Sequence, residues 1–129
     1  MTYSVTALYA GLAALVLVAL SARVSQLRRR TGIGIGHGDD ETLARAVRVQ
    51  GNFIEYTPFA LLLILIAENG GIPVWMLHGL GIALLLGRIL HATGLSQSPG
   101  ISAGRLIGTT LTWLVVLIGG IVALYIAAA

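Results

Sequence analysis

Long apolar stretches alternate with short polar segments along the 129 residues, and this pattern predicts four helices. The first 22 residues carry no charged side chain, and a helix needs about 20 such residues to cross a bilayer core of about 30 Å. Three further apolar segments follow. We expect helices over about residues 2–30, 41–69, 73–95 and 102–127.

The connections after the second and third helices carry clear turn signals. Gly-Gly-Ile-Pro occupies residues 70–73 and Ser-Pro-Gly occupies residues 98–100; glycine commonly ends a helix and proline commonly begins the next. Short connections force neighbouring helices to run antiparallel. The predicted fold is therefore a single all-α integral membrane domain over residues 1–129, a four-transmembrane-helix antiparallel bundle.

The composition supports lipid as the solvent of this chain. Hydrophobic residues make up 57% of the sequence and charged residues only 10%, which is too apolar for a soluble domain of this length. The chain has no cysteine, which excludes disulfides, thiolate metal sites and a cysteine nucleophile. A net charge of +3 beside apolar spans favours anionic lipid headgroups or a small anionic ligand as partners, not nucleic acid.

All eight basic residues are arginines that fall at one end of the predicted bundle. They are Arg23, Arg28, Arg29, Arg30, Arg45, Arg48, Arg88 and Arg105. The positive-inside rule predicts that this end is cytoplasmic and that both termini lie on the opposite side. A cleaved secretory signal is the competing interpretation of the first segment, but basic residues follow its apolar stretch and none precedes it.

The glycine-rich loop at residues 32–40 resembles a nucleotide-binding fingerprint only in composition. That fingerprint requires a strand before it and a helix after it, whereas two membrane helices flank this loop. His37 and Asp39 are too few to predict a metal site. We expect Asp39, Asp40 and Glu41 to cap the second helix and to complement its dipole.

The second helix carries the most informative polar residues. Arg48, Asn52, Glu55 and Tyr56 follow the spacing i, i+4, i+7 and i+8, so they share one stripe. Because polar groups facing lipid are costly, this stripe either forms an internal network that fixes helix register or lines a pocket. We further expect three arginines, one on each of the last three helices, to converge with Glu55, and the excess of positive charge favours an anionic ligand that carries carboxylates. The additional residues are Arg88 and His91 on the third helix and Arg105 at the start of the fourth.

These residues resemble the MAPEG superfamily of membrane-associated proteins in eicosanoid and glutathione metabolism. The resemblance rests on Arg48-x-Gln50-x-Asn52-x-x-Glu55-Tyr56-x-Pro58 and on the order of four helices. It implies a homotrimer that binds glutathione between subunits near the cytoplasmic side, and a simpler, bacterial type of member in an inner membrane. The implied glutathione-binding residues are Arg48, Gln50, Asn52, Glu55, Tyr56, Arg88 and His91, although His91 and Leu95 stand where the eicosanoid enzymes have tyrosines.

The resemblance also implies a catalytic role for Arg105, which matches the arginine that stabilises the glutathione thiolate. A guanidinium favours a nearby thiolate electrostatically and cannot act as a general base. The implied function is a glutathione-dependent transferase or peroxidase that acts on an apolar electrophile or a lipid hydroperoxide. The alternatives are a non-catalytic membrane protein that binds a lipid or protein partner and, for Arg105 alone, a surface anchor.

Two further expectations concern contacts between helices. Small residues at Gly104 and Gly108, at Ala10 and Ala14 and at residues 119–120 are expected to let helices approach closely. His78 lies near the end of the bundle that lacks arginine, where Glu68 is its expected partner.

Overall fold

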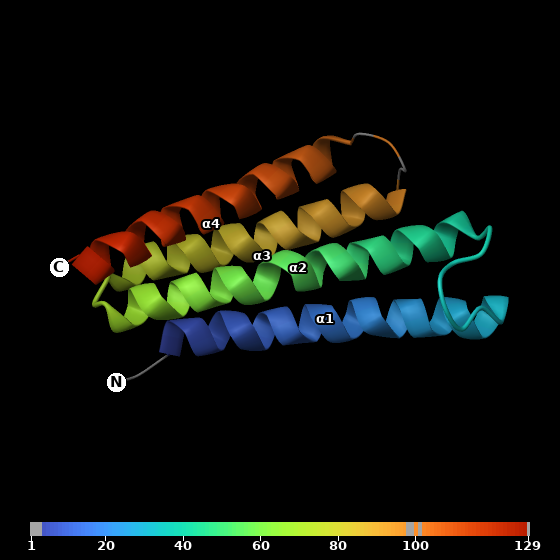
Figure 1. Ribbon diagram of the computed structural model, residues 1–129, viewed down its shortest axis with the longest axis horizontal. Helices are drawn as coiled ribbons and strands as arrows, with labels where there is room; N and C mark the ends of the chain where they lie inside the picture. The colour runs from blue at the N-terminus through green and yellow to red at the C-terminus, as the bar shows by residue number, and fades with distance from the viewer. Residues whose placement is uncertain (1–3, 98–99, 101, 129) are drawn as a thin grey trace.

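Four long helices make up the bundle in the computed structural model, which describes residues 4–97, 100 and 102–128. They are α1 (Ser4–Thr31), α2 (Glu41–Asn69), α3 (Val74–Gln97) and α4 (Ala103–Ala128). Each is long and apolar enough to cross a membrane. The helices run alternately up and down, with the start of α1 and the end of α4 at one end of the bundle and the end of α1 and the start of α4 at the other (Figure 1). The predicted four-helix antiparallel fold is confirmed.

Helices α2 and α3 form the middle of the bundle. Helix α1 packs on both of them from one side and α4 packs on both from the other, while no contact joins α1 to α4 within the described residues (Figure 1). The outer helices therefore keep wide apolar faces exposed, with side chains such as Leu15 (69% exposed) and Leu124 (73%). In a membrane such faces meet lipid or further protein.

The largest apolar core lies in the half of the bundle that contains the chain termini. From α2 it takes Ala60, Ile64 and Ala67, which follow helical spacing and face inward. Its other buried members are Val5, Tyr9, Leu77, Leu80, Leu84 and Val115. The polar stripe of α2 and the buried Arg88 and His91 of α3 lie outside this core, in the arginine-rich half.

The start of α2 is capped as its sequence predicts. The Asp40 carboxylate accepts a hydrogen bond from the Leu43 amide at 2.7 Å, which satisfies one of the free N–H groups at the helix start. The preceding loop is tied to the end of α1, because the Arg28 guanidinium donates to the carbonyls of Ile33 and Gly36 at 3.1 and 3.0 Å.

At the opposite end, the structure corrects the expected partner of His78. The Glu68 carboxylate accepts hydrogen bonds from the backbone amides of Val5 and Thr6 at 3.0 and 2.9 Å. The ring of His78 instead meets the Tyr9 hydroxyl, with 3.0 Å between Nδ1 and the oxygen. The first amides of a helix lack partners within it and carry its positive dipole end, so they attract a carboxylate.

Candidate functional site

Arg48 and Glu55 form an ion pair on the outer part of the α2 stripe. The distances from Arg48 Nη1 and Nη2 to the two Glu55 carboxylate oxygens are 2.9 and 3.4 Å. Both side chains stay about half exposed, at 59% and 49%. Exposed ion pairs contribute only about 0–1 kcal/mol. The ion pair is therefore weak and accessible to solvent. A ligand with both a negative and a positive group could break it and bind to Arg48 and Glu55 instead.

Arg88 is the buried centre of the polar cluster. Its residue is only 3% exposed, and its Nη1 donates to Asn52 Oδ1 at 2.6 Å while its Nε donates to Thr112 Oγ1 at 2.9 Å. The guanidinium carbon lies 5.5 Å from the ring centre of Tyr56, which is cation–π distance. One buried charge thus joins α2, α3 and α4 and fixes the positions of Asn52 and Tyr56.

Glycine contacts between α3 and α4 make this arrangement sterically feasible. A Cβ added at Gly108 would lie 2.5 Å from both the Gly87 carbonyl oxygen and the His91 amide nitrogen. A Cβ added at Gly94 would lie 2.5 Å from the Arg105 amide nitrogen. The helices therefore touch backbone to backbone along the segment that carries the polar residues, and the expected close approach at Gly108 is confirmed.

His91 and Arg105 complete the cluster. His91 is 5% exposed and experiences the positive charges of Arg88, Arg105 and Arg48, so these four side chains gather at the arginine-rich end. Arg105 is half-buried, and its backbone N–H is capped by the Ser102 hydroxyl at 3.3 Å. Among the described residues, no group accepts a hydrogen bond from the Arg105 guanidinium.

Gln50 lies apart from the other predicted ligand-binding residues. Its side-chain amide donates to the Ser21 hydroxyl of α1 at 2.8 Å, because position 50 falls on the face of α2 opposite the stripe. Six of the seven predicted binding residues and Arg105 thus gather on one side of α2 at the arginine-rich end of a single chain. Gln50 lies at the same end but points toward α1.

Thr112 is a member of the cluster that the sequence analysis did not single out. Its hydroxyl accepts from Arg88 and donates to the Gly108 carbonyl at 2.9 Å, so it is fully engaged. The sequence could have indicated this role for Thr112, since Arg105, Gly108 and Thr112 follow the spacing i, i+3 and i+7 along one face of α4.

Comparison with known proteins identifies the family of this chain. The model of the MAPEG family matches residues 6–125, which is nearly the whole chain. The inner membrane protein YecN of Escherichia coli strain K12 is 39% identical over 114 residues, covering 88% of this chain and 86% of the relative. The protein of the same name from E. coli O6:H1 matches with the same identity and coverage. With four helices long and apolar enough to span a membrane and a family match over almost its full length, the chain belongs to the MAPEG family.

Proposed function

We propose that this protein is a glutathione-dependent transferase or peroxidase that acts on an apolar electrophile or lipid hydroperoxide. The observation that carries the proposal is the polar cluster at the arginine-rich end, where the Arg105 guanidinium has no acceptor among the described residues while its neighbours are held in place. A half-buried guanidinium without a partner is suited to an anionic ligand atom.

The residues of the cluster fit the chemistry of glutathione. The tripeptide carries two carboxylates, one ammonium group and one thiol. Arg48 and Glu55 offer one charge of each sign on an accessible surface, and Asn52 and Tyr56 add a side-chain amide and a phenol on the same stripe. Arg88 serves as a positioning residue, because its donors are occupied by Asn52 and Thr112 within the chain.

Arg105 is assigned the electrostatic role in the reaction. Glutathione, when bound, supplies a thiol whose deprotonated form is the nucleophile. A free thiol has a pKa of about 8.5, and a nearby guanidinium lowers it by stabilising the anion. The guanidinium keeps its own proton throughout, so Arg105 holds charge and does not transfer a proton.

The proposal includes a homotrimer with its sites between subunits, oriented with the arginine-rich end toward the cytoplasm. One observation supports this assembly: Gln50 faces away from the cluster of its own chain and toward α1. With a site between subunits, Gln50 would contribute to the site of a neighbouring copy. Small apolar substrates would then enter from the lipid.

Replacing Arg105 tests its catalytic role. We expect Arg105→Ala to abolish the thiolate absorbance that appears when glutathione binds to the wild-type protein, and Arg105→Lys to retain part of it because the charge remains. The affinity for glutathione should change less than the thiolate signal. Ultraviolet difference spectroscopy of the detergent-solubilised protein measures both.

Arg30→Ala is the matched control, because Arg30 is an exposed arginine at the same end of the bundle and lies outside the cluster. It should leave the thiolate signal unchanged. An equal signal in wild type and in Arg105→Ala would remove Arg105 from the mechanism and leave it as a surface anchor.

A non-catalytic membrane protein is the second candidate function. It is favoured by the internal pairing of Arg48 with Glu55 and by the internal hydrogen bonds of Arg88, which together need no ligand. This candidate predicts that glutathione produces no thiolate signal in any variant, including the wild type.

A further inference from the structure

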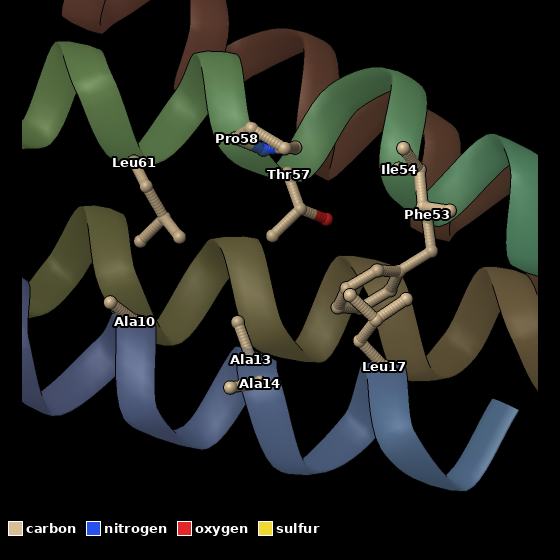
Figure 2. A pocket seen from close by; sticks show the side chains of 9 residues that line it. All are labelled: Ala10, Ala13, Ala14, Leu17, Phe53, Ile54, Thr57, Pro58 and Leu61. Carbon is tan, nitrogen blue, oxygen red and sulfur yellow. The ribbon is translucent and has the colours of Figure 1, made fainter. Parts of the chain in front are cut away.

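A groove between α1 and α3 lies at the arginine-rich end of the bundle. Its volume is about 220 Å³, and its lining residues are Leu20, Arg23, Ala92, Thr93, Ser96 and Gln97. Arg23, Thr93 and Gln97 are exposed, so the groove opens on the surface of the chain. The groove in Figure 2 differs from it, because that groove faces α2 farther from this end and no charged side chain lines it.

Arg23 brings a positive charge to the α1–α3 groove. Its Nη1 donates to the Ser96 hydroxyl at 2.8 Å, and a guanidinium has five N–H donors in all. Among the described residues, no acidic side chain forms an ion pair with Arg23 and none lines the groove. The charge is therefore not compensated within the chain. An anionic group such as a phosphate matches the fork of N–H donors that remains.

Neutral polar side chains of α3 surround this charge. The Ser96 hydroxyl accepts from Arg23 and can donate its own hydrogen to a ligand oxygen. The Gln97 amide offers both a donor and an acceptor. Thr93 donates to the carbonyls of its own helix at 3.0 and 3.1 Å, which leaves its oxygen as an acceptor. This lining suits a ligand with one negative charge and neutral hydroxyl groups, since it offers no carboxylate to a ligand ammonium group.

The position of the groove along α1 places it at the boundary of the membrane. Arg23 is the first charged residue after 22 uncharged ones. The helix rises about 29 Å from Ser4 to Arg23, which is close to the thickness of a bilayer core of about 30 Å. A guanidinium at such a position lies at the level of the lipid headgroups. The groove is therefore at the depth of phospholipid phosphates.

The polarity of the groove changes with depth. Helices α1 and α3 run parallel (Figure 1), so residues with lower numbers lie deeper in the bilayer in both helices. Leu20 and Ala92 line the deeper part, about one turn below Arg23 and Ser96. A phospholipid has the same order, with a polar headgroup above apolar chains. A soluble phosphate has no apolar part that would contact Leu20 and Ala92.

We propose that the α1–α3 groove binds an anionic phospholipid whose phosphate pairs with Arg23 and whose remaining headgroup is uncharged and carries hydroxyl groups, as in phosphatidylglycerol. Ser96 holds the guanidinium in place, and Leu20 and Ala92 contact the start of the acyl chains. The groove lies on the α1 side of α2 and α3, whereas the cluster around Arg88 joins α2, α3 and α4. Binding of this lipid therefore requires no glutathione.

The test compares two phospholipids that share their acyl chains and differ in headgroup charge. The purified full chain in a neutral detergent is mixed with equal amounts of dioleoyl-phosphatidylglycerol and dioleoyl-phosphatidylcholine, and native mass spectrometry counts the bound lipids. We expect the wild type to retain more of the anionic lipid. Arg23→Gln should lower the ratio of anionic to zwitterionic lipid about fivefold, the effect of one arginine near a membrane surface. Arg23→Lys should keep part of the preference because the charge remains.

Arg30→Gln is the matched control for charge. Arg30 is exposed on the same stripe of α1, two turns beyond Arg23, and lies outside the groove. Its replacement should leave the lipid ratio nearly unchanged. An equal loss in the Arg23 and Arg30 variants would assign the preference to the whole basic end and overturn the proposal, as would an unchanged ratio in Arg23→Gln.

A second pair of variants tests the place of binding. Ala92→Phe fills the groove and should reduce retention of the anionic lipid. Leu86→Phe alters a side chain of α3 that is 51% exposed and lies outside the groove, so retention should not change. Full retention of the anionic lipid by Ala92→Phe would contradict binding in the groove.

Competition with soluble anions separates a lipid site from other anion sites. Inorganic phosphate and reduced glutathione, each added in excess at constant ionic strength, should leave the bound phosphatidylglycerol in place. Displacement by inorganic phosphate would identify a site for soluble phosphate, and displacement by glutathione would make the groove part of a glutathione site. Either displacement would overturn the proposal, and neither result depends on whether the protein forms a thiolate.

Discussion

Replacing Gly108 with alanine is expected to force α3 and α4 apart and to destabilise the protein by about 3 kcal/mol, the upper end of the usual cost of overpacking. The new methyl group would lie 2.5 Å from the Gly87 carbonyl oxygen and 2.9 Å from the His91 Cα. These are backbone atoms, which cannot rotate away as a side chain does. Separating the helices would also lengthen the Arg88–Thr112 hydrogen bond, which is 2.9 Å in the native bundle.

Gly120→Ala is the matched control on the same helix. A Cβ at that position meets no atom within 4 Å, and alanine favours helix over glycine by up to about 1 kcal/mol. The control should therefore be neutral or slightly stabilising in an unfolding titration of the detergent-solubilised protein. Equal stability of the Gly108 and Gly120 variants would contradict the close contact between α3 and α4.

Asn52→Leu is expected to cost more stability than Arg88→Met, although Arg88 makes more contacts. Removing Asn52 leaves a buried guanidinium without its 2.6 Å partner, and hydrogen bonds to charged groups contribute about 1.5–3 kcal/mol. Removing Arg88 also removes the charge that is expensive to bury. The half-buried Asn52 can then turn to water, and Thr112 keeps its bond to the Gly108 carbonyl.

The double variant Asn52→Leu/Arg88→Met sharpens this test. It should be about as stable as Arg88→Met alone, because the cost of losing Asn52 exists only while the charge is present. A double-mutant cycle from chemical unfolding gives the coupling energy directly. Strict additivity of the two single changes would show that Asn52 does not stabilise the Arg88 charge.

The helices and the polar stripe followed from local sequence patterns. Apolar length identified the four spans, and the cap at Asp40 depends on residues three positions apart. The stripe from Arg48 to Tyr56 needed only helical spacing. These features are predictable because each depends on residues close together in the chain.

The partners that join different helices were predicted less well. Ser21 as the partner of Gln50, Tyr9 as the partner of His78 and Thr112 as an acceptor for Arg88 depend on how whole helices rotate against each other. Composition gives no information on that rotation.

The packing of small residues was also predicted only in part, because it depends on the neighbouring helix. A Cβ at Gly119 would meet the Leu63 side chain at 2.9 Å, so a helix packs closely there. The small side chains of Ala10 and Ala14 instead line an open groove. The expectation of close packing is thus confirmed at Gly119 and wrong at Gly120, where an added Cβ would meet no atom within 4 Å. It is also wrong for the two alanines, because only the opposing helix decides whether a small residue creates a contact or a space.

The melting temperature of the purified protein with and without reduced glutathione tests most directly whether the arginine-rich cluster is a glutathione site. A ligand at one hundred times its dissociation constant stabilises the folded state by about 2.7 kcal/mol, so we predict a clear upward shift at millimolar glutathione. Arg48→Met should weaken this shift, and Arg30→Ala should preserve it. An unchanged melting temperature of the wild-type protein at millimolar glutathione would contradict the assignment.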